Sequence, residues 1–174
     1  FQGNDGGSAI TAMTIDMSEG GNVGIGTGVP SSYYAKNLVV MADGDGTGGI
    51  TIAAPATDDN TYLAFADGTS GAAAYAGYVG YRHASTEYLF FGAGGGTRMY
   101  ITEGGNVGIG SSSPGSNLHV KGSGETQVYI DAATNNNPGV RFLENGANKW
   151  TIGNDNANDG FFFYDFGASA ERMR

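Results

Sequence analysis

Residues 19–26 read Glu-Gly-Gly-Asn-Val-Gly-Ile-Gly, and residues 103–110 repeat these eight residues without a change. The two copies begin 84 residues apart, at positions 19 and 103. A proline follows each copy at the same spacing, Pro30 in the first and Pro114 in the second. An unbroken repeat of this length indicates that the chain contains two copies of one structural unit.

The octapeptide has the pattern of a glycine-rich strand. Val and Ile alternate with Gly, so an extended chain carries two branched apolar side chains on one face and bare backbone on the other. Glycine weakens a strand interior and is tolerated where another strand or chain approaches closely. This favours a strand at the symmetry axis of an oligomer; a glycine-rich hairpin within one subunit is the alternative. The predicted axis residues are Val23, Ile25, Val107 and Ile109.

The composition is that of a β protein. The 174 residues include 32 Gly, 10 Tyr and 9 Phe, and only 14% are charged. Aromatic residues are typical of strands, and no window keeps apolar residues at helical spacing, so almost no helix is expected. The net charge is −9 and the eight basic residues are scattered, which argues against nucleic acid as a partner. Cysteine is absent, and no signal peptide or transmembrane run is visible, so no membrane insertion is expected.

Alignment of the two copies divides the chain. Residues 1–12 are assigned to a tag remnant and linker, because Phe1-Gln2-Gly3 resembles the remainder of an engineered protease site. The first repeat is predicted over 13–98 and the second over 99–172, with 173–174 beginning a truncated third. The first copy has a four-residue insertion at 33–36. Strands are predicted near 13–16, 22–26, 37–41, 50–54, 61–66, 76–82, 87–92 and 97–102.

The alignment also matches a strand and a turn between the two copies. Residues 89–91 (Leu-Phe-Phe) match residues 162–164 (Phe-Phe-Tyr), and the Asp67-Gly68 turn matches Asn145-Gly146. Both dipeptides are hairpin signals, since a type I′ turn needs positive φ at both central positions. Each repeat has many short strands but few large aliphatic residues, a thin core that oligomerisation would complete. The predicted fold class is therefore all-β, with two tandem repeats of about 84 residues that each resemble a sandwich or prism. Three chains wrapped about one axis would let the four axis residues form shared apolar layers, which predicts an intertwined homotrimer.

The sequence from Gly105 to Val120 carries a family resemblance. Gly-Asn-Val-Gly-Ile-Gly, followed by Ser, Pro and Leu-His-Val, resembles the repeat of bacteriophage tail fibres and related trimeric adhesive fibres, and also the surface fibres of predatory bacteria. The resemblance covers residues of about 13–40 and 97–122. It implies a homotrimeric, extracellular fibre segment, on a virion or a bacterial surface, that recognises a cell surface. No motif of the C-terminal self-cleaving chaperone found in many such fibres is present.

Several other chemistries fit the residues poorly. Residues 24–28 are glycine-rich but lack the lysine and the long following helix of a nucleotide-binding loop. The two histidines, His83 and His119, lie in different copies without a nucleophile motif. The acidic loops at 43–47 and 155–160 could hold calcium, but neither has the distal glutamate that would complete a known loop. No enzyme activity, cofactor or metal is therefore predicted.

Ligand-binding residues are expected where the two copies differ. The segment 81–88 occupies the place that residues 154–160 hold in the second copy, and it combines aromatic rings with Arg, His and Glu. Rings stack on pyranose faces, and planar polar groups bind hydroxyls. The alternative is that these rings pack between strands. The candidates are Tyr81, Arg82, His83, Glu87, Tyr88, Tyr33, Tyr34, Trp150, Asn154 and Asp155.

The predicted function is attachment. The chain would be a non-catalytic, receptor-binding segment of a trimeric fibre that binds carbohydrate or lipopolysaccharide on a host or prey cell, with three-fold avidity. Its predicted partners are two further copies of itself and this glycan. The alternative is a purely structural shaft, with recognition located elsewhere, because unchanged repeats are suited to building a rod.

Overall fold

The computed structural model describes residues 2–5, 8–17, 21–34, 37–42, 49–55, 59–157 and 160–173, with side chains from residue 12 onward. The chain divides into two compact units, residues 1–120 and residues 121–174. Each unit is described by itself. The two octapeptides both belong to the first unit.

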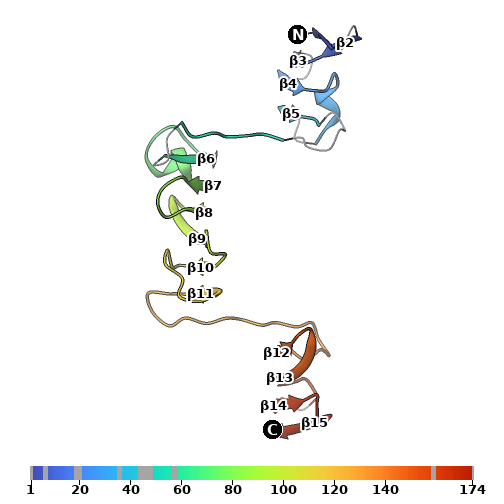
Figure 1. Ribbon diagram of the computed structural model, residues 1–174, viewed down its shortest axis with the longest axis vertical. Helices are drawn as coiled ribbons and strands as arrows, with labels where there is room; N and C mark the ends of the chain where they lie inside the picture. The colour runs from blue at the N-terminus through green and yellow to red at the C-terminus, as the bar shows by residue number, and fades with distance from the viewer. Residues whose placement is uncertain are drawn as a thin grey trace. The chain divides into compact units, whose positions relative to one another are not determined.

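The described residues form strands and two short 3-10 turns, which confirms an all-β chain with almost no helix (Figure 1). The 3-10 turns are η1 (Pro30–Ser32) and η2 (Gly71–Tyr75). The strands of the first unit are β1 (Gln2–Asp5), β2 (Ser8–Thr11), β3 (Met13–Asp16), β4 (Asn22–Ile25), β5 (Leu38–Val40), β6 (Asn60–Phe65), β7 (Gly77–Arg82), β8 (Tyr88–Ala93), β9 (Gly96–Thr102), β10 (Val107–Ile109) and β11 (Leu118–Val120). Those of the second unit are β12 (Gly139–Glu144), β13 (Ala147–Asp155), β14 (Gly160–Asp165) and β15 (Ala170–Met173).

Three sheets and one hairpin contain these strands. β1 and β2 form the hairpin, and β3, β4 and β5 form a three-stranded sheet in that order. The six strands from β6 to β11 make one sheet in chain order, and β12 to β15 make the sheet of the second unit. Neighbouring strands are antiparallel except for β4 with β5 and β10 with β11, which run parallel. Short connections between sequential strands thus account for almost all of the pairing.

One face of the six-stranded sheet is apolar. Strand register places its side chains in two rows that cross all six strands. The first row is Leu63, Val79, Phe91, Met99, Ile109 and Val120. The second row is Thr61, Tyr81, Leu89, Ile101, Val107 and Leu118. We call these two rows, together with Phe65, the apolar face.

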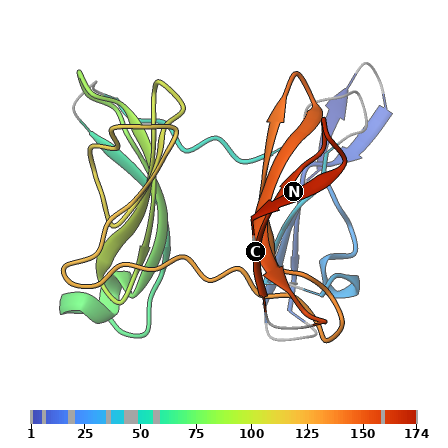
Figure 2. The ribbon, with the colours of Figure 1, turned by 90° about the horizontal axis from the view of Figure 1, so that it is seen from below.

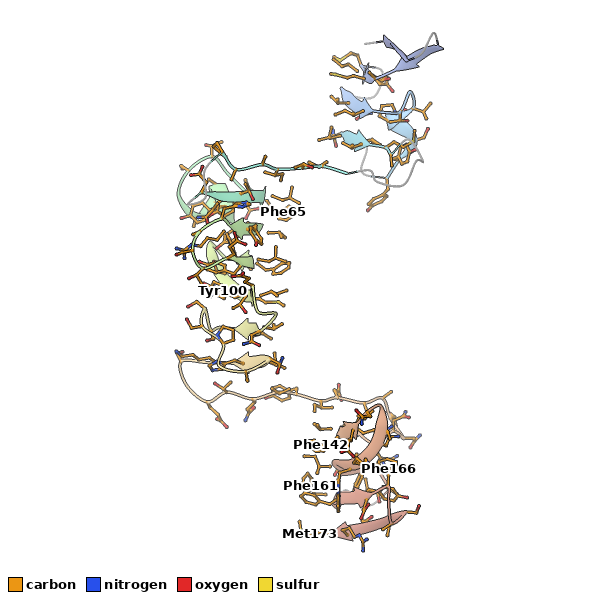
Figure 3. The ribbon with its side chains drawn as sticks, in the orientation of Figure 1. Phe65, Tyr100, Phe142, Phe161, Phe166 and Met173 are labelled. Carbon is orange, nitrogen blue, oxygen red and sulfur yellow. The ribbon has the colours of Figure 1, made fainter. Side chains whose placement is uncertain are left out.

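The opposite face of this sheet carries aromatic rings over glycines. Its central row is Tyr62, Gly80, Phe90, Tyr100, Gly108 and His119. Figure 3 shows Tyr100 and Phe65 projecting from opposite sides of the sheet. Phe90 is 5% exposed, because the edges of Tyr62, Tyr78 and Tyr88 pack around it. We call this the aromatic face, and η2 lies on the same side of the sheet (Figure 2).

The octapeptide is a central strand in each of two sheets. Val23 pairs with Leu38 on β5 as Val107 pairs with Leu118 on β11. The connection from β4 to β5 is four residues longer than that from β10 to β11, because it contains the insertion at 33–36. The predicted insertion therefore lies in a connection and leaves the strand register unchanged.

The bare glycine face of the octapeptide is occupied by the same chain. A Cβ on Gly24 would lie 2.7 Å from the carbonyl oxygen of Thr27 and 3.4 Å from Pro30. Gly108 is packed in the same way against Ser111. The close approach inferred from the sequence is thus made by the turn that follows each octapeptide. The Val and Ile face is the one left for other contacts, since Ile25 and Ile109 are 44% and 45% exposed.

The four-stranded sheet of the second unit has a similar apolar row. Val140, Ile152, Phe163 and Met173 are aligned across its strands, as Leu63, Val79, Phe91 and Met99 are in the first unit. Figure 3 shows Phe142, Phe161 and Met173 on one side of this sheet and Phe166 on the other. Phe91 lies between Val79 and Met99 in its sheet, and Phe163 lies between Ile152 and Met173 in the other. Phe91 therefore corresponds to Phe163 and not to Tyr164, so the sequence alignment of these strands was wrong by one residue.

Some local predictions were also wrong. Residues 50–54 form no strand ladder and are extended, as are residues 127–133 in the second unit. Asn145 and Gly146 have positive φ and form the predicted tight turn, but Asp67-Gly68 belongs to a longer connection that contains η2.

The predicted domain bounds can be placed on these strands. Residues 1–12 include β1 and β2, and the boundary predicted between residues 98 and 99 lies within β9. These bounds stay predictions.

The described residues bury very little apolar surface. Only Val39 and Phe90 are buried hydrophobic residues, whereas twenty-five large hydrophobic residues are exposed. On the apolar face, Leu63, Phe65 and Leu118 are 57%, 58% and 59% exposed. A monomeric protein rarely exposes a contiguous apolar surface of this kind.

Candidate functional site

The structure brings five predicted site residues together at one end of the β7–β8 hairpin. β7 ends at Arg82 and β8 begins at Tyr88, and these two residues are paired across the strands. We call Tyr81, Arg82, His83, Glu87 and Tyr88 the tip cluster. All five side chains are half-buried.

Direct contacts hold the tip cluster in place. The Tyr81 hydroxyl donates a hydrogen bond to Oε2 of Glu87 at 2.8 Å, and Nη1 of Arg82 donates to the Tyr88 hydroxyl at 3.1 Å. The Arg82 guanidinium also lies 5.4 Å from the centre of the Tyr88 ring. The His83 ring is 4.9 Å from that of Tyr81, and its Nε2 is 3.3 Å from Oγ1 of Thr61. The polar groups are therefore already engaged with one another.

The hydrogen bond to Glu87 changes the acidity of Tyr81. It raises the pKa of the Tyr81 hydroxyl, and partial burial and the negative charges of Glu87 and Glu103 act in the same direction. Tyr81 is thus held as a neutral donor, the opposite of what an activated phenolate would need. The same side chain belongs to the apolar face, whereas Arg82 and Tyr88 belong to the aromatic face.

The other predicted ligand residues lie elsewhere in the chain. Tyr33 and Tyr34 follow η1; the Tyr33 hydroxyl contacts the Met41 sulfur at 3.4 Å, and the Tyr34 side chain is fully exposed. In the second unit, Trp150 is 40% exposed and pairs with Phe142 on the apolar side of the sheet. Asn154 lies on that same side, opposite Phe161. Asp155 accepts a hydrogen bond from the backbone amide of Ala157, in the manner of a turn residue.

A groove lined by tyrosines lies on the aromatic face and was not predicted. Its volume is about 410 Å³, and its lining residues are Tyr62, Ala64, Tyr75 and Tyr78. We call it the tyrosine groove. Tyr62 and Ala64 alternate along β6 with Leu63 and Phe65, so strand geometry places them on the opposite face. These four residues are all apolar or aromatic, so no polar alternation in the sequence distinguished the two faces.

The described residues show no place for a metal ion. They contain no group of three or more His, Asp or Glu side chains that could act together as ligands. The acidic loop at 43–47 lies outside the described residues. Of the acidic loop at 155–160, residues 155–157 and 160 are described. In the described part of the chain, neither 3-10 turn has the length or apolarity of a membrane-spanning helix.

Comparison with known proteins does not assign the chain. No protein-family model matches the sequence, and no curated protein matches it significantly. Its function is therefore inferred from the sheets, the tip cluster and the tyrosine groove.

Proposed function

We propose that this chain is a segment of a homotrimeric, intertwined β fibre whose three copies share one apolar core. The observation that supports this is the pair of apolar rows that cross the six-stranded sheet. Full burial of one such side chain contributes about 1.5–3 kcal/mol. A row that is exposed in the single chain contributes this stabilisation only when another copy covers it.

The same surface recurs along the chain, which supports a fibre of two tandem repeats. The second unit repeats the row with Val140, Ile152, Phe163 and Met173. The three-stranded sheet places Val23 and Ile25 beside Leu38 and Val40 on one face. In the proposed trimer, the equivalent sheets of three copies turn their apolar faces inward and form a prism. The resemblance to trimeric adhesive fibres favours three copies over two. The residues predicted at the axis, Val23, Ile25, Val107 and Ile109, all belong to this surface.

Light scattering with size-exclusion chromatography tests the proposal. The expected mass is about 53 kDa, three times the 17.8 kDa of one chain. Leu63→Asp places a charge in the apolar rows and should lower the mass or the melting temperature sharply. Asn60→Asp is the matched control, because it adds the same charge to β6 on the other face of the sheet. A wild-type mass of 17.8 kDa would overturn the proposal.

A second candidate role is attachment to cell-surface carbohydrate. It is supported by the tip cluster and the tyrosine groove, which place aromatic rings beside hydroxyl, guanidinium and carboxylate groups. The groove lies on the face opposite the apolar rows, so it stays open when those rows are covered. In this role the fibre would be extracellular and non-catalytic, carried on a virion or a bacterial surface. A purely structural shaft remains the alternative, and glycan binding distinguishes the two.

A further inference from the structure

We propose that the tyrosine groove binds a neutral pyranose sugar. This inference rests on the proposed attachment role and gives it a site and a ligand class. The groove volume of about 410 Å³ falls within the range of small-molecule sites, about 300–1,000 Å³. The site is distinct from the tip cluster, since the two share no residue.

Two rings of the groove are held in fixed positions. The Tyr78 hydroxyl and Oγ1 of Thr97 are 2.8 Å apart and share a hydrogen bond. The Tyr78 ring also fills the space above Gly92, where a Cβ would overlap it. Tyr62 packs edge-on against Tyr78 and Phe90, with ring centres 5.8 Å and 5.5 Å away. Because the rings are already ordered, binding does not have to restrict them further.

The exposed parts of the groove suit a sugar ring. Tyr62 and Tyr75 are each 46% exposed, so ring surface is available for stacking on the C–H face of a pyranose. A tyrosine hydroxyl can both donate and accept, which matches the hydroxyl groups of a sugar. The remaining lining residue, Ala64, leaves room beside the rings.

The charge of the groove and of the chain selects a neutral ligand. The lining residues are tyrosines and one alanine, so there is no guanidinium or ammonium to bind a carboxylate or phosphate. The chain has a net charge of −9, which repels anionic glycans. The expected ligands are therefore neutral hexoses and N-acetylhexosamines, and sialylated or uronic sugars should bind less well.

The test is an array of neutral and acidic glycosides, followed by titration of the best neutral binder with the intact protein. Tyr75→Ala should weaken binding about tenfold, because it removes a stacking ring. Tyr75→Phe should retain most of the affinity. Tyr129→Ala, at a tyrosine 87% exposed in the second unit, is the control and should bind as the wild type does.

Four results would overturn the groove proposal. One is that no neutral glycoside binds while light scattering still shows the trimer, in which case the fibre stands and the groove is not a sugar site. Another is that acidic sugars bind as tightly as neutral ones. The third is that a Tyr81→Ala, Tyr88→Ala double variant abolishes binding while Tyr75→Ala does not, which would assign the sugar to the tip cluster. A preference for apolar peptides over every glycoside would likewise contradict it.

Discussion

Phe90 lies directly opposite Gly80 across strands β7 and β8, and its ring occupies the space that a side chain on Gly80 would need. A Cβ on Gly80 would be 2.5 Å from Cζ of Phe90 and 3.0 Å from the carbonyl oxygen of Thr61. This relationship explains a glycine in the interior of a strand, where glycine otherwise weakens the sheet. It also makes Phe90 one of the two buried hydrophobic residues of the described chain.

Gly80→Ala should therefore destabilise the protein by about 1–3 kcal/mol, the usual cost of forcing an extra methyl group into a packed site. The measurement is the thermal or denaturant midpoint at a fixed protomer concentration, since stability of an oligomer depends on concentration. Gly115→Ala is the control, because a Cβ there meets no atom within 4 Å. Equal midpoints for the two variants would show that the Phe90 ring is free to move away.

The Asp165 carboxylate should make the stability of the fold decrease at acid pH. Partial burial acts to raise its pKa, but hydrogen bonds from the Ala168 amide, the Arg172 guanidinium and the Gly167 amide outweigh this, so the pKa lies below the ordinary 3.8. Both Nε and Nη2 of Arg172 donate to Oδ2, at 3.2 and 3.1 Å. A lowered pKa stabilises the fold above the ordinary value, and this contribution is lost as the pH falls through the lowered pKa.

Asp165→Asn should accordingly lower the melting temperature at pH 7, and the difference from wild type should shrink as the pH falls below the ordinary pKa of 3.8 and through the lowered pKa. Thermal melts across this range are the measurement. Asp131→Asn, at an exposed carboxylate in the extended segment, is the control and should shift the melt little. A wild-type-to-Asp165→Asn difference that stays constant with pH would show that the carboxylate contributes through shape and not through its charge.

The sequence predicted strands at β3 to β9, but it missed β1 and β2 and placed a strand at 50–54 that forms no ladder. Along β6, Leu63 and Phe65 alternate with Tyr62 and Ala64, so successive side chains lie on opposite faces of the sheet. What the sequence could not provide was the register between strands. The apolar rows exist only because Leu63, Val79 and Phe91 are paired across β6, β7 and β8. The position of Phe163 likewise depends on its pairing with Ile152, which sequence similarity between the two copies does not encode.

The functional surface was harder to predict for the same reason. The tip cluster was found because residues 81–88 are close in sequence. The tyrosine groove joins Tyr62, Tyr75 and Tyr78 through a hairpin connection that contains η2, and the sequence had suggested a tight turn at Asp67-Gly68. In the same sheet, the tight turn is formed instead by Gly94 and Gly95, which both have positive φ and connect β8 to β9.

The extended segment 49–55 contributes an apolar side chain to the apolar side of the six-stranded sheet. Its alternating Ile50 and Ile52 predicted a strand, because alternation reports a half-buried extended chain but does not identify a hydrogen-bonding neighbour. Ile52 is 48% exposed and, with Leu63, Val79 and Leu89, lines a hollow of about 170 Å³. In the second unit, Val128 and Ile130 line a hollow of about 300 Å³ with Val140, Ile152 and Phe161. Both extended segments thus place apolar side chains at the apolar side of a sheet.

If these segments are enclosed in the proposed trimer, Ile52→Asp should lower the melting temperature substantially, because it would bury an unpaired carboxylate. Thr51→Asp is the matched control: the neighbouring side chain points to the other side of an extended chain and is exposed. Melts at equal protomer concentration, with light scattering on each variant, give the comparison. If the two variants melt at the same temperature and keep the wild-type mass, Ile52 remains in solvent, and in the proposed trimer the sheets of the other copies would cover the apolar face without this segment.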